Sequence, residues 1–209
     1  MAKIKQGILG GFSGSVANIV GSSWKGMAVM KSKPLSVANP RTAKQVAQRN
    51  AFKAASQTAA GCKANIIKPF WDKSAQYMSG ANAWMSDNVK NYNSSGIPTL
   101  NDLVFSKGSI GSQNIDNATV NAGGTLVTIT WDKTDIPQNG SLSDLAAAVV
   151  IGDKGEVLGS QAINTVTRED EVLDMTVNFS SNPTHATAYL LFKDAEEIKQ
   201  SESNYYQIM

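Results

Sequence analysis

The sequence predicts a mixed α+β fold in which a glycine-rich extended N-terminal arm precedes a helical hairpin and an all-β sandwich. Three observations support this prediction. Glycine is dense from Met1 to Pro40, apolar residues then recur at helical spacing, and short runs of alternating polar and apolar residues fill the C-terminal part. The expected parts are an arm over 1–38, a helical hairpin over 39–96, a linker segment over 97–116 and the sandwich over 117–209.

The arm combines many glycines with many apolar residues. Glycine at this density disfavours a helix because it loses the most backbone entropy on folding. The apolar residues between the glycines are too numerous for a solvated tail, so we expect short strands with tight turns that lie against another part of the chain or another subunit. The residues expected at this assembly interface are Ile8, Leu9, Phe12, Val16, Ile19, Trp24, Met27, Val29 and Met30.

The first helix of the hairpin is expected directly after the arm. Asn39 before Pro40 predicts a helix N-cap followed by proline at the first helical position. Gly61 is expected to loosen or end the helix. The predicted apolar stripe, at steps of three and four residues, consists of Val46, Arg49 or Asn50, Phe52, Ala55, Ala59 and Cys62.

A second helical region is predicted from Lys68 to Val89, with a bend near Ser79-Gly80. Pro69 stands early in it, where proline is tolerated. Two amphipathic helices joined by a short turn form a helical hairpin, whose aromatic face must be covered. The aromatic and methionine positions, which we expect in a core or interface, are Phe70, Trp71, Met78, Trp84 and Met85.

The C-terminal part shows the period of half-buried strands. Val127, Ile129 and Trp131 alternate with polar residues, and Gly155 stands where a short hairpin turn needs a positive φ. The expected strands are 117–121, 125–132, 145–152, 156–166, 172–180, 186–193 and 204–208. Seven such strands predict an immunoglobulin-like or fibronectin-like sandwich with Trp131 in its core.

The charges are distributed unevenly along the chain. Residues 1–93 carry 13 Lys and Arg against 2 acidic residues, a net charge of +11, whereas 94–209 carry 6 against 15, a net charge of −9. This asymmetry indicates two regions in different environments, or head-to-tail attraction between copies. A basic half is also compatible with nucleic acid, through Lys3, Lys5, Lys25, Lys31, Lys33, Arg41, Lys44 and Arg49. Because these side chains are scattered, direct nucleic-acid binding is the less favoured alternative.

No motif for catalysis, for a cofactor or for a metal emerges from the sequence. Cys62 and His185 are the only residues of their types, and we expect a buried thiol on a helix and a surface turn. The glycines of the arm match neither phosphate-binding pattern. The acidic run 168–171 has no known calcium-loop spacing, so we expect a solvated loop.

The sequence predicts neither a signal peptide nor a membrane-spanning segment. The apolar run after Lys3 and Lys5 is broken by glycine and is too short for a signal-peptide core. No stretch approaches the ~20 apolar residues of a membrane span. We therefore expect a protein that is made and left in the cytoplasm of its host.

Two stretches carry a family resemblance. The opening KIKQGILGGFSG, which starts at Lys3, resembles the start of an uncharacterised family found in Bacteroidetes genomes and their phages and prophages, including crAss-like phages. The run from Asn39 to Phe52 is similar to an NPRTxxQxxQRxxF element that recurs in phage and prophage structural proteins. The resemblance implies a virion component and supplies no catalytic residues.

These observations together lead to a functional hypothesis. We expect a non-enzymatic phage virion structural protein, a head or tail accessory component such as a head fibre or a decoration of the capsid. It would assemble through its arm and helical region with its own copies and other virion proteins, without a cofactor, a metal or a membrane. The alternative is a host-surface or nucleic-acid-associated binding protein of a phage or prophage.

Overall fold

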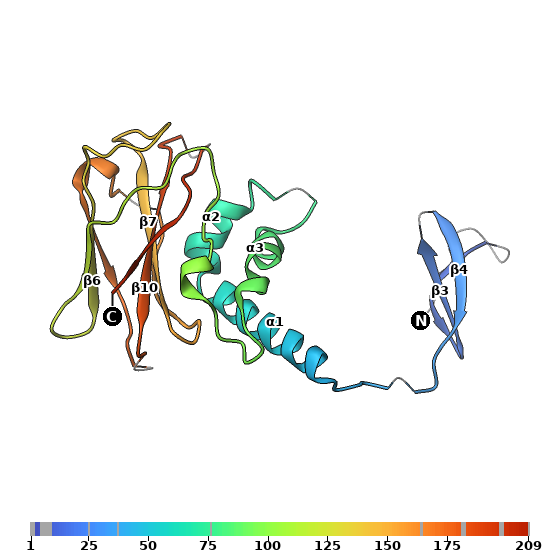
Figure 1. Cartoon of the computed structure of the whole chain (residues 1–209). Helices are drawn as coiled ribbons and strands as arrows, with labels where there is room; N and C mark the ends of the chain where they lie inside the picture. Colours follow the sequence, from blue (N-terminus) through green and yellow to red (C-terminus); the bar gives the residue numbers. More distant parts are fainter. Residues whose placement is uncertain are drawn as a thin grey trace. The chain divides into compact units, whose positions relative to one another are not determined.

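The computed structural model describes residues 3–4, 10–24, 26–36, 38–75, 77–163, 165–180, 183–196 and 199–208 (Figure 1). The chain divides into two compact units, Met1–Arg41 and Thr42–Met209. Three antiparallel sheets and a few helices make up the described residues, so the predicted α+β class is confirmed. We call the second unit the body.

The first unit contains a single antiparallel sheet, which we call the N-terminal sheet. Its strands follow in the order β1 (Lys3–Ile4), β2 (Phe12–Val16), β3 (Ile19–Trp24) and β4 (Met27–Ser32). Two tight turns join the last three strands, and each contains a residue with positive φ, Ala17 at 47° and Gly26 at 84°. Each strand therefore pairs with its neighbour in sequence, as in a meander.

The first helix of the body, α1 (Ala43–Gly61), begins later than expected. Thr42 is its N-cap and forms a capping box with Gln45, in which each side chain accepts a hydrogen bond from the other residue's backbone N–H at 3.4 Å. The predicted cap at Asn39 is therefore wrong, because threonine followed by glutamine three residues later satisfies both backbone N–H groups. Gly61 ends the helix as predicted, and a π-helical turn, η1 (Lys63–Ile67), follows.

The second helical region is two helices instead of one bent helix. The short α2 (Lys68–Trp71) ends in a turn, and α3 (Gly80–Asn88) begins after the N-cap Ser79, continuing into a 3-10 turn, η2 (Val89–Asn91). The Ser79 hydroxyl accepts a hydrogen bond from Asn82 N–H at 3.3 Å. The Asp72 carboxylate accepts one from Gly80 N–H at 2.8 Å. These two side chains stabilise a fresh helix start where periodicity alone suggested continuity.

Seven strands in the described part of the body lie within the predicted ranges. They are β5 (Asn117–Val120), β6 (Leu126–Thr130), β7 (Leu145–Gly152), β8 (Val157–Gln161), β9 (Val172–Thr176), β10 (Ala186–Lys193) and β11 (Asn204–Gln207). Of these, β8 and β9 end before the predicted ends at 166 and 180. One sheet has the order β11-β10-β7-β8 and the other β5-β6-β9. Gly155, with a φ of 82°, makes the predicted hairpin turn between β7 and β8.

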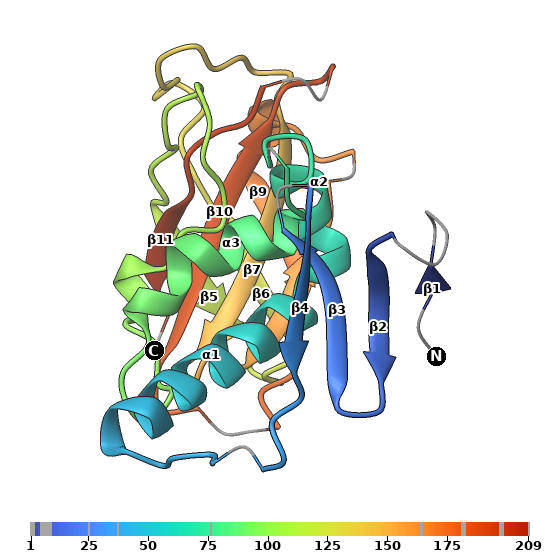
Figure 2. The same cartoon turned by 90° about the vertical axis from the view of Figure 1, so that its right-hand side faces the viewer.

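The four-stranded sheet is the middle layer of the body (Figures 1 and 2). Along β7 and β10, even-numbered residues such as Val150 and Phe192 face the three-stranded sheet, and odd-numbered residues such as Val149 and Tyr189 face the helices. The register pairs large with small, with Phe192 opposite Ala146. This alternation buries both faces of the two central strands.

Residues 97–116, expected as a linker, instead pack into the body. Phe105 is fully buried, with its ring 4.6 Å from that of Tyr189 and 5.7 Å from that of Trp84 between centroids. The indole N–H of Trp71 donates to the Phe105 carbonyl at 2.8 Å. Its first half, which includes a 3-10 turn, η3 (Leu100–Asp102), fills the space between the helices and the middle sheet, whereas Ile115 near its end packs against the core between the two sheets.

A buried arginine lies at one end of the two facing sheets of the body. Arg168, in the 3-10 turn η4 (Arg168–Asp170), was expected in a solvated loop, but it is fully buried and pairs with the buried Asp144 at 3.1 Å. Its guanidinium also donates to Gln113 Oε1 and lies 3.9 Å from the centroid of the Phe192 ring. The indole N–H of Trp131, a core residue as predicted, donates to the Arg168 carbonyl at 2.8 Å.

Replacement of this arginine tests how much the network contributes to stability. Arg168→Ala should lower the free energy of unfolding of the body by about 3–5 kcal/mol, because it leaves Asp144 buried and unpaired. The measurement is urea unfolding followed by circular dichroism. Lys133→Ala is the control, since the exposed Lys133–Glu171 pair at 3.3 Å should be worth at most about 1 kcal/mol. A similar loss in both variants would contradict the role assigned to Arg168.

Candidate functional site

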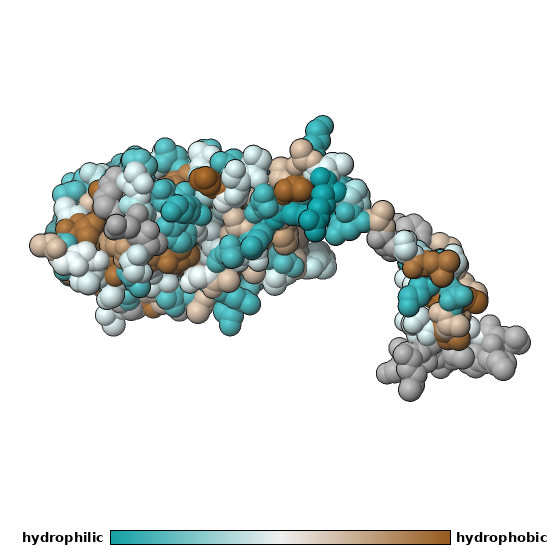
Figure 3. All heavy atoms as spheres, turned by 90° about the horizontal axis from the view of Figure 1, so that it is seen from below, coloured by the Kyte–Doolittle hydropathy of each residue, from teal (hydrophilic) through white to brown (hydrophobic). Residues whose placement is uncertain are grey.

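The predicted interface residues of the N-terminal sheet are largely exposed. Val16 and Met30 keep 54% and 65% of their surface accessible, and Ile19, Met27 and Val29 are exposed as well. Figure 3 shows hydrophobic side chains gathered on the surface of this unit. Phe12 is half-buried, the side chain of Trp24 is not described although its backbone belongs to β3, and Ile8 and Leu9 lie outside the described residues.

The register of the strands assigns these side chains to two faces. Val16 pairs with Ile19, and Met30 pairs with Gly21, two residues further along β3, so Val16, Ile19 and Met30 share one face. Successive side chains of a strand point to opposite faces, so the odd-numbered Met27 and Val29 of β4 lie on the face opposite to that of Met30. Both faces of the N-terminal sheet therefore carry exposed apolar side chains.

One glycine of the sheet is required by packing. Gly21 of β3 is buried, and a Cβ atom placed on it would overlap the carbonyl of Phe12 and come within 2.6 Å of the Phe12 ring. The aromatic ring thus covers the glycine of the neighbouring strand, which holds β2 and β3 together. This contact explains why glycine and phenylalanine occur together in the segment.

A second apolar surface lies on the exposed N-terminal half of α1. Phe52, predicted in the buried stripe, has 57% of its surface exposed, and Val46 is exposed too. The buried residues of α1 and its C-cap are Ala51, Ala55, Thr58, Ala59 and Cys62, so the predicted stripe is confirmed at Ala55, Ala59 and Cys62. Phe52 stands one residue, or about 100°, round the helix from Ala51. Small residues at steps of three and four residues are the signal that identifies the packed face, and they leave Phe52 outside it.

The residues around Phe52 form a shallow hollow of about 380 Å³ on the surface of α1. It is lined by Gln45, Gln48, Arg49, Phe52 and Lys53, which we call the α1 face. Four of these residues are the Gln, Gln, Arg and Phe of the NPRTxxQxxQRxxF pattern. Capping of α1 explains why the pattern contains Thr42 and Gln45. The other three residues, Gln48, Arg49 and Phe52, are exposed on one side of the helix.

The candidate reactive residues do not form a site together. Cys62 is fully buried, and burial raises the pKa of its thiol to about 12. His185 lies exposed beside β10, within 3.5 Å of the Gln207 amide. In the described part of the chain no group of three or more His, Cys, Asp or Glu side chains is placed to hold a metal ion.

The described residues contain no helix that is both long enough and apolar enough to span a bilayer.

The chain consists of an α+β body and a small antiparallel sheet whose apolar side chains are exposed on both faces. The chain belongs to DUF6266, a family of unknown function, whose sequence model matches residues 11–207. The match runs from the N-terminal sheet to β11, so it includes both units. A comparison with curated proteins and one with solved structures each give no match.

Enlarging the buried glycine of the N-terminal sheet tests that sheet separately from the body. Gly21→Val should destroy the pairing of β2 with β3, because the new side chain overlaps Phe12. Hydrogen exchange followed by mass spectrometry should show lost protection in peptides from 10–32 and unchanged protection in β7 and β10. Ser23→Val, at an exposed position of the same strand, is the matched control and should preserve protection.

The environment of Cys62 predicts an unreactive thiol. With its pKa raised to about 12, the thiol stays protonated at pH 8 and only about one molecule in 10⁴ carries the thiolate. A disulfide reagent should therefore label the native chain at least 100-fold more slowly than the unfolded chain. The control is Cys62→Ala/Lys63→Cys, which moves the thiol to an exposed neighbour. Equal labelling rates for the native wild type and this control would contradict the prediction.

Proposed function

We propose that this chain is a non-enzymatic structural protein of a phage particle, a head or tail accessory component that assembles through its N-terminal sheet and its helical region. The observation that carries the proposal is the exposed apolar surface on both faces of the N-terminal sheet. In this proposal the sheet is the glycine-rich anchoring arm expected from the sequence.

A single-layered sheet has no second layer against which to bury its apolar side chains. Val16, Ile19 and Met30 on one face and Met27 and Val29 on the other therefore remain in water unless another surface covers them. Exposed apolar patches of this kind mark sites of protein–protein contact. In addition, β4 is an edge strand, to which an extended segment of a neighbouring subunit can add by backbone hydrogen bonds.

The finer part of the fold proposal is an immunoglobulin-like or fibronectin-like sandwich in the body. The strand orders support it, since the first, second and fifth strands (β5, β6 and β9) share one sheet and the third, sixth and seventh (β7, β10 and β11) share the other, as in such a sandwich. The fourth strand, β8, pairs here with β7. The packing of Trp131 against Phe192, with ring centroids 5.3 Å apart between the sheets, is a further supporting feature. Such a module suits a projecting or decorating role.

A second candidate function is nucleic-acid association, and one observation favours it. From Met1 to Trp71 the sequence has 11 Lys and Arg and no acidic residue. Several of these, including Lys31, Lys33, Lys44 and Lys53, are exposed. Binding through them would weaken steeply with added salt, because it releases counterions from the phosphate backbone.

The proposed function is tested by quantitative mass spectrometry on density-purified particles from a host that carries the gene. Detection at tens to hundreds of copies per particle is the expected result, and the copy number would distinguish a ring, a fibre and a shell component. Absence from the particles would overturn the virion proposal. Salt-dependent binding to DNA would then make nucleic-acid association the leading candidate.

The role of the N-terminal sheet is tested by its own variants. Val16→Ser/Ile19→Ser/Met30→Ser should weaken self-association about 100-fold, if each half-exposed side chain loses about 1 kcal/mol of burial. Sedimentation velocity on the full chain gives the dissociation constants. Leu35→Ser is the control, because Leu35 is 97% exposed and lies outside the sheet. An unchanged dissociation constant in the triple variant would show that this face does not mediate self-association. The variant Met27→Ser/Val29→Ser tests the opposite face of the sheet.

A further inference from the structure

A second contact surface is suggested by two exposed features on opposite sides of the body. The first is the α1 face, in which the exposed Phe52 is flanked by Arg49 and Lys53. No acidic residue lines this hollow. The surface therefore combines an apolar centre with positively charged neighbours, which is the composition of a docking site for an acidic segment.

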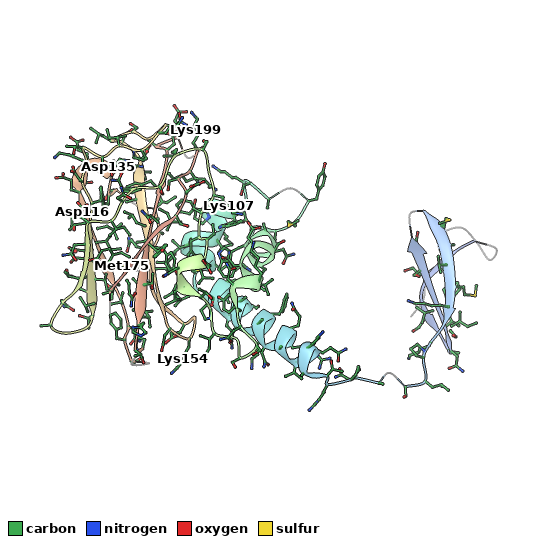
Figure 4. All side chains as sticks on the ribbon, viewed as in Figure 1. Lys107, Asp116, Asp135, Lys154, Met175 and Lys199 are labelled. Atoms are coloured by element: carbon green, nitrogen blue, oxygen red, sulfur yellow. The ribbon has the colours of Figure 1, made fainter. Side chains whose placement is uncertain are left out.

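The second feature is the turn that follows β6, residues 132–136, which we call the acidic turn. Ile136 is 45% exposed, and Asp132 and Asp135 are exposed in the same turn. Asp116 lies nearby, because its N–H donates to the carbonyl of Thr130 at the end of β6. Figure 4 places Asp116 and Asp135 on the same side of the body. This surface also has an apolar centre, and carboxylates flank it, while Lys133 of the same turn pairs with Glu171 at 3.3 Å.

Local hydrogen bonds hold the acidic turn in shape. The backbone N–H and the hydroxyl of Thr134 both donate to Asp132 Oδ1 at 2.7 Å, and they lower the pKa of this carboxyl. Asp135 accepts a hydrogen bond from the Asn114 side chain at 2.8 Å. The hydrogen bonds therefore preorganise the turn, so that binding orders little additional chain.

The two surfaces cannot meet within one copy. The helix α1 packs on one face of the middle sheet, and β6 belongs to the sheet that covers the other face. Both surfaces lie in the same compact unit, so their separation is set by the fold. A contact between them must join two copies, and it leaves one α1 face and one acidic turn unused at the two ends of the pair.

We propose that the acidic turn of one copy docks on the α1 face of the next copy in a head-to-tail contact. The contact places Ile136 against Phe52 and the carboxylates of Asp116 and Asp135 near Arg49 and Lys53. Heterologous contacts of this type repeat, and they close into a ring or continue as a filament. This inference rests on the proposed function, to which it adds the partner and the symmetry of the assembly.

The expected strength of the contact follows from its exposed position. Exposed ion pairs contribute about 0–1 kcal/mol each, so the contact is weak in isolation and depends on the many copies of an assembly. Its charged flanks should make it sensitive to salt, since the screening length falls from about 10 Å at 0.1 M to about 3 Å at 1 M. Association through this contact should therefore weaken at least tenfold between these two salt concentrations.

Charge reversal on the full chain tests the proposal. The helix variant Arg49→Glu/Lys53→Glu and the turn variant Asp116→Lys/Asp135→Lys should each lose at least tenfold in self-association, measured by sedimentation velocity at about 0.1 M salt. An equimolar mixture of the two variants should recover association, because every junction then joins opposite charges again. Lys154→Glu and Glu202→Lys are controls at exposed positions outside both surfaces and should behave as the wild type.

The outcomes separate this inference from the proposed function. If the mixture does not recover while the triple variant of the N-terminal sheet still weakens association, the head-to-tail contact is overturned and the assembly role of the sheet stands. If the mixture recovers but the protein is absent from particles, the contact stands and the virion role falls. If the helix variant instead loses binding to a DNA duplex and self-association is unchanged, the α1 face binds nucleic acid and the proposal is overturned.

Discussion

The body depends on one constraint, which is the burial of both faces of β7 and β10. Every residue of these two strands is buried or nearly so, and neither strand carries the polar face that a solvated sheet requires. One cover is the sheet β5-β6-β9, and the other is formed by the helices with the segment 97–105. The helical and β regions are therefore parts of one folding unit, held together by the same two strands.

The same constraint explains why a charged residue is tolerated at one end of the two facing sheets. Where the two sheets stop facing each other, Arg168 fills the space beside Phe192, and its charge is balanced by the buried Asp144. Its hydrogen bonds to Gln113 and to the carbonyl of Ser141 connect it to two segments that are distant in sequence. A buried ion pair contributes little net stability, but it penalises any packing that separates the partners.

The two units differ in how completely their side chains are buried and hydrogen-bonded. The body buries most of its large aromatic residues, and the indole N–H groups of Trp71 and Trp131 donate hydrogen bonds, although that of Trp84 is buried without a partner. The N-terminal sheet exposes apolar residues on both faces. The α1 face shows the same contrast within the body, since Phe52 stays exposed beside a well-packed row of small residues. These exposed apolar side chains are the features that folding of a single copy does not explain.

The sequence by itself determined what depends on neighbours along the chain. Alternation located β6 and β9, turn residues separated the other strand runs, Gly155 marked a hairpin, and Trp131 and Cys62 were correctly predicted as buried. Only the tertiary structure decided what depends on distant segments. Arg168 is buried, 97–105 packs against the middle sheet and Phe52 stays exposed, because burial of a side chain depends on the remote surface that covers it. A local sequence pattern contains no information about that surface.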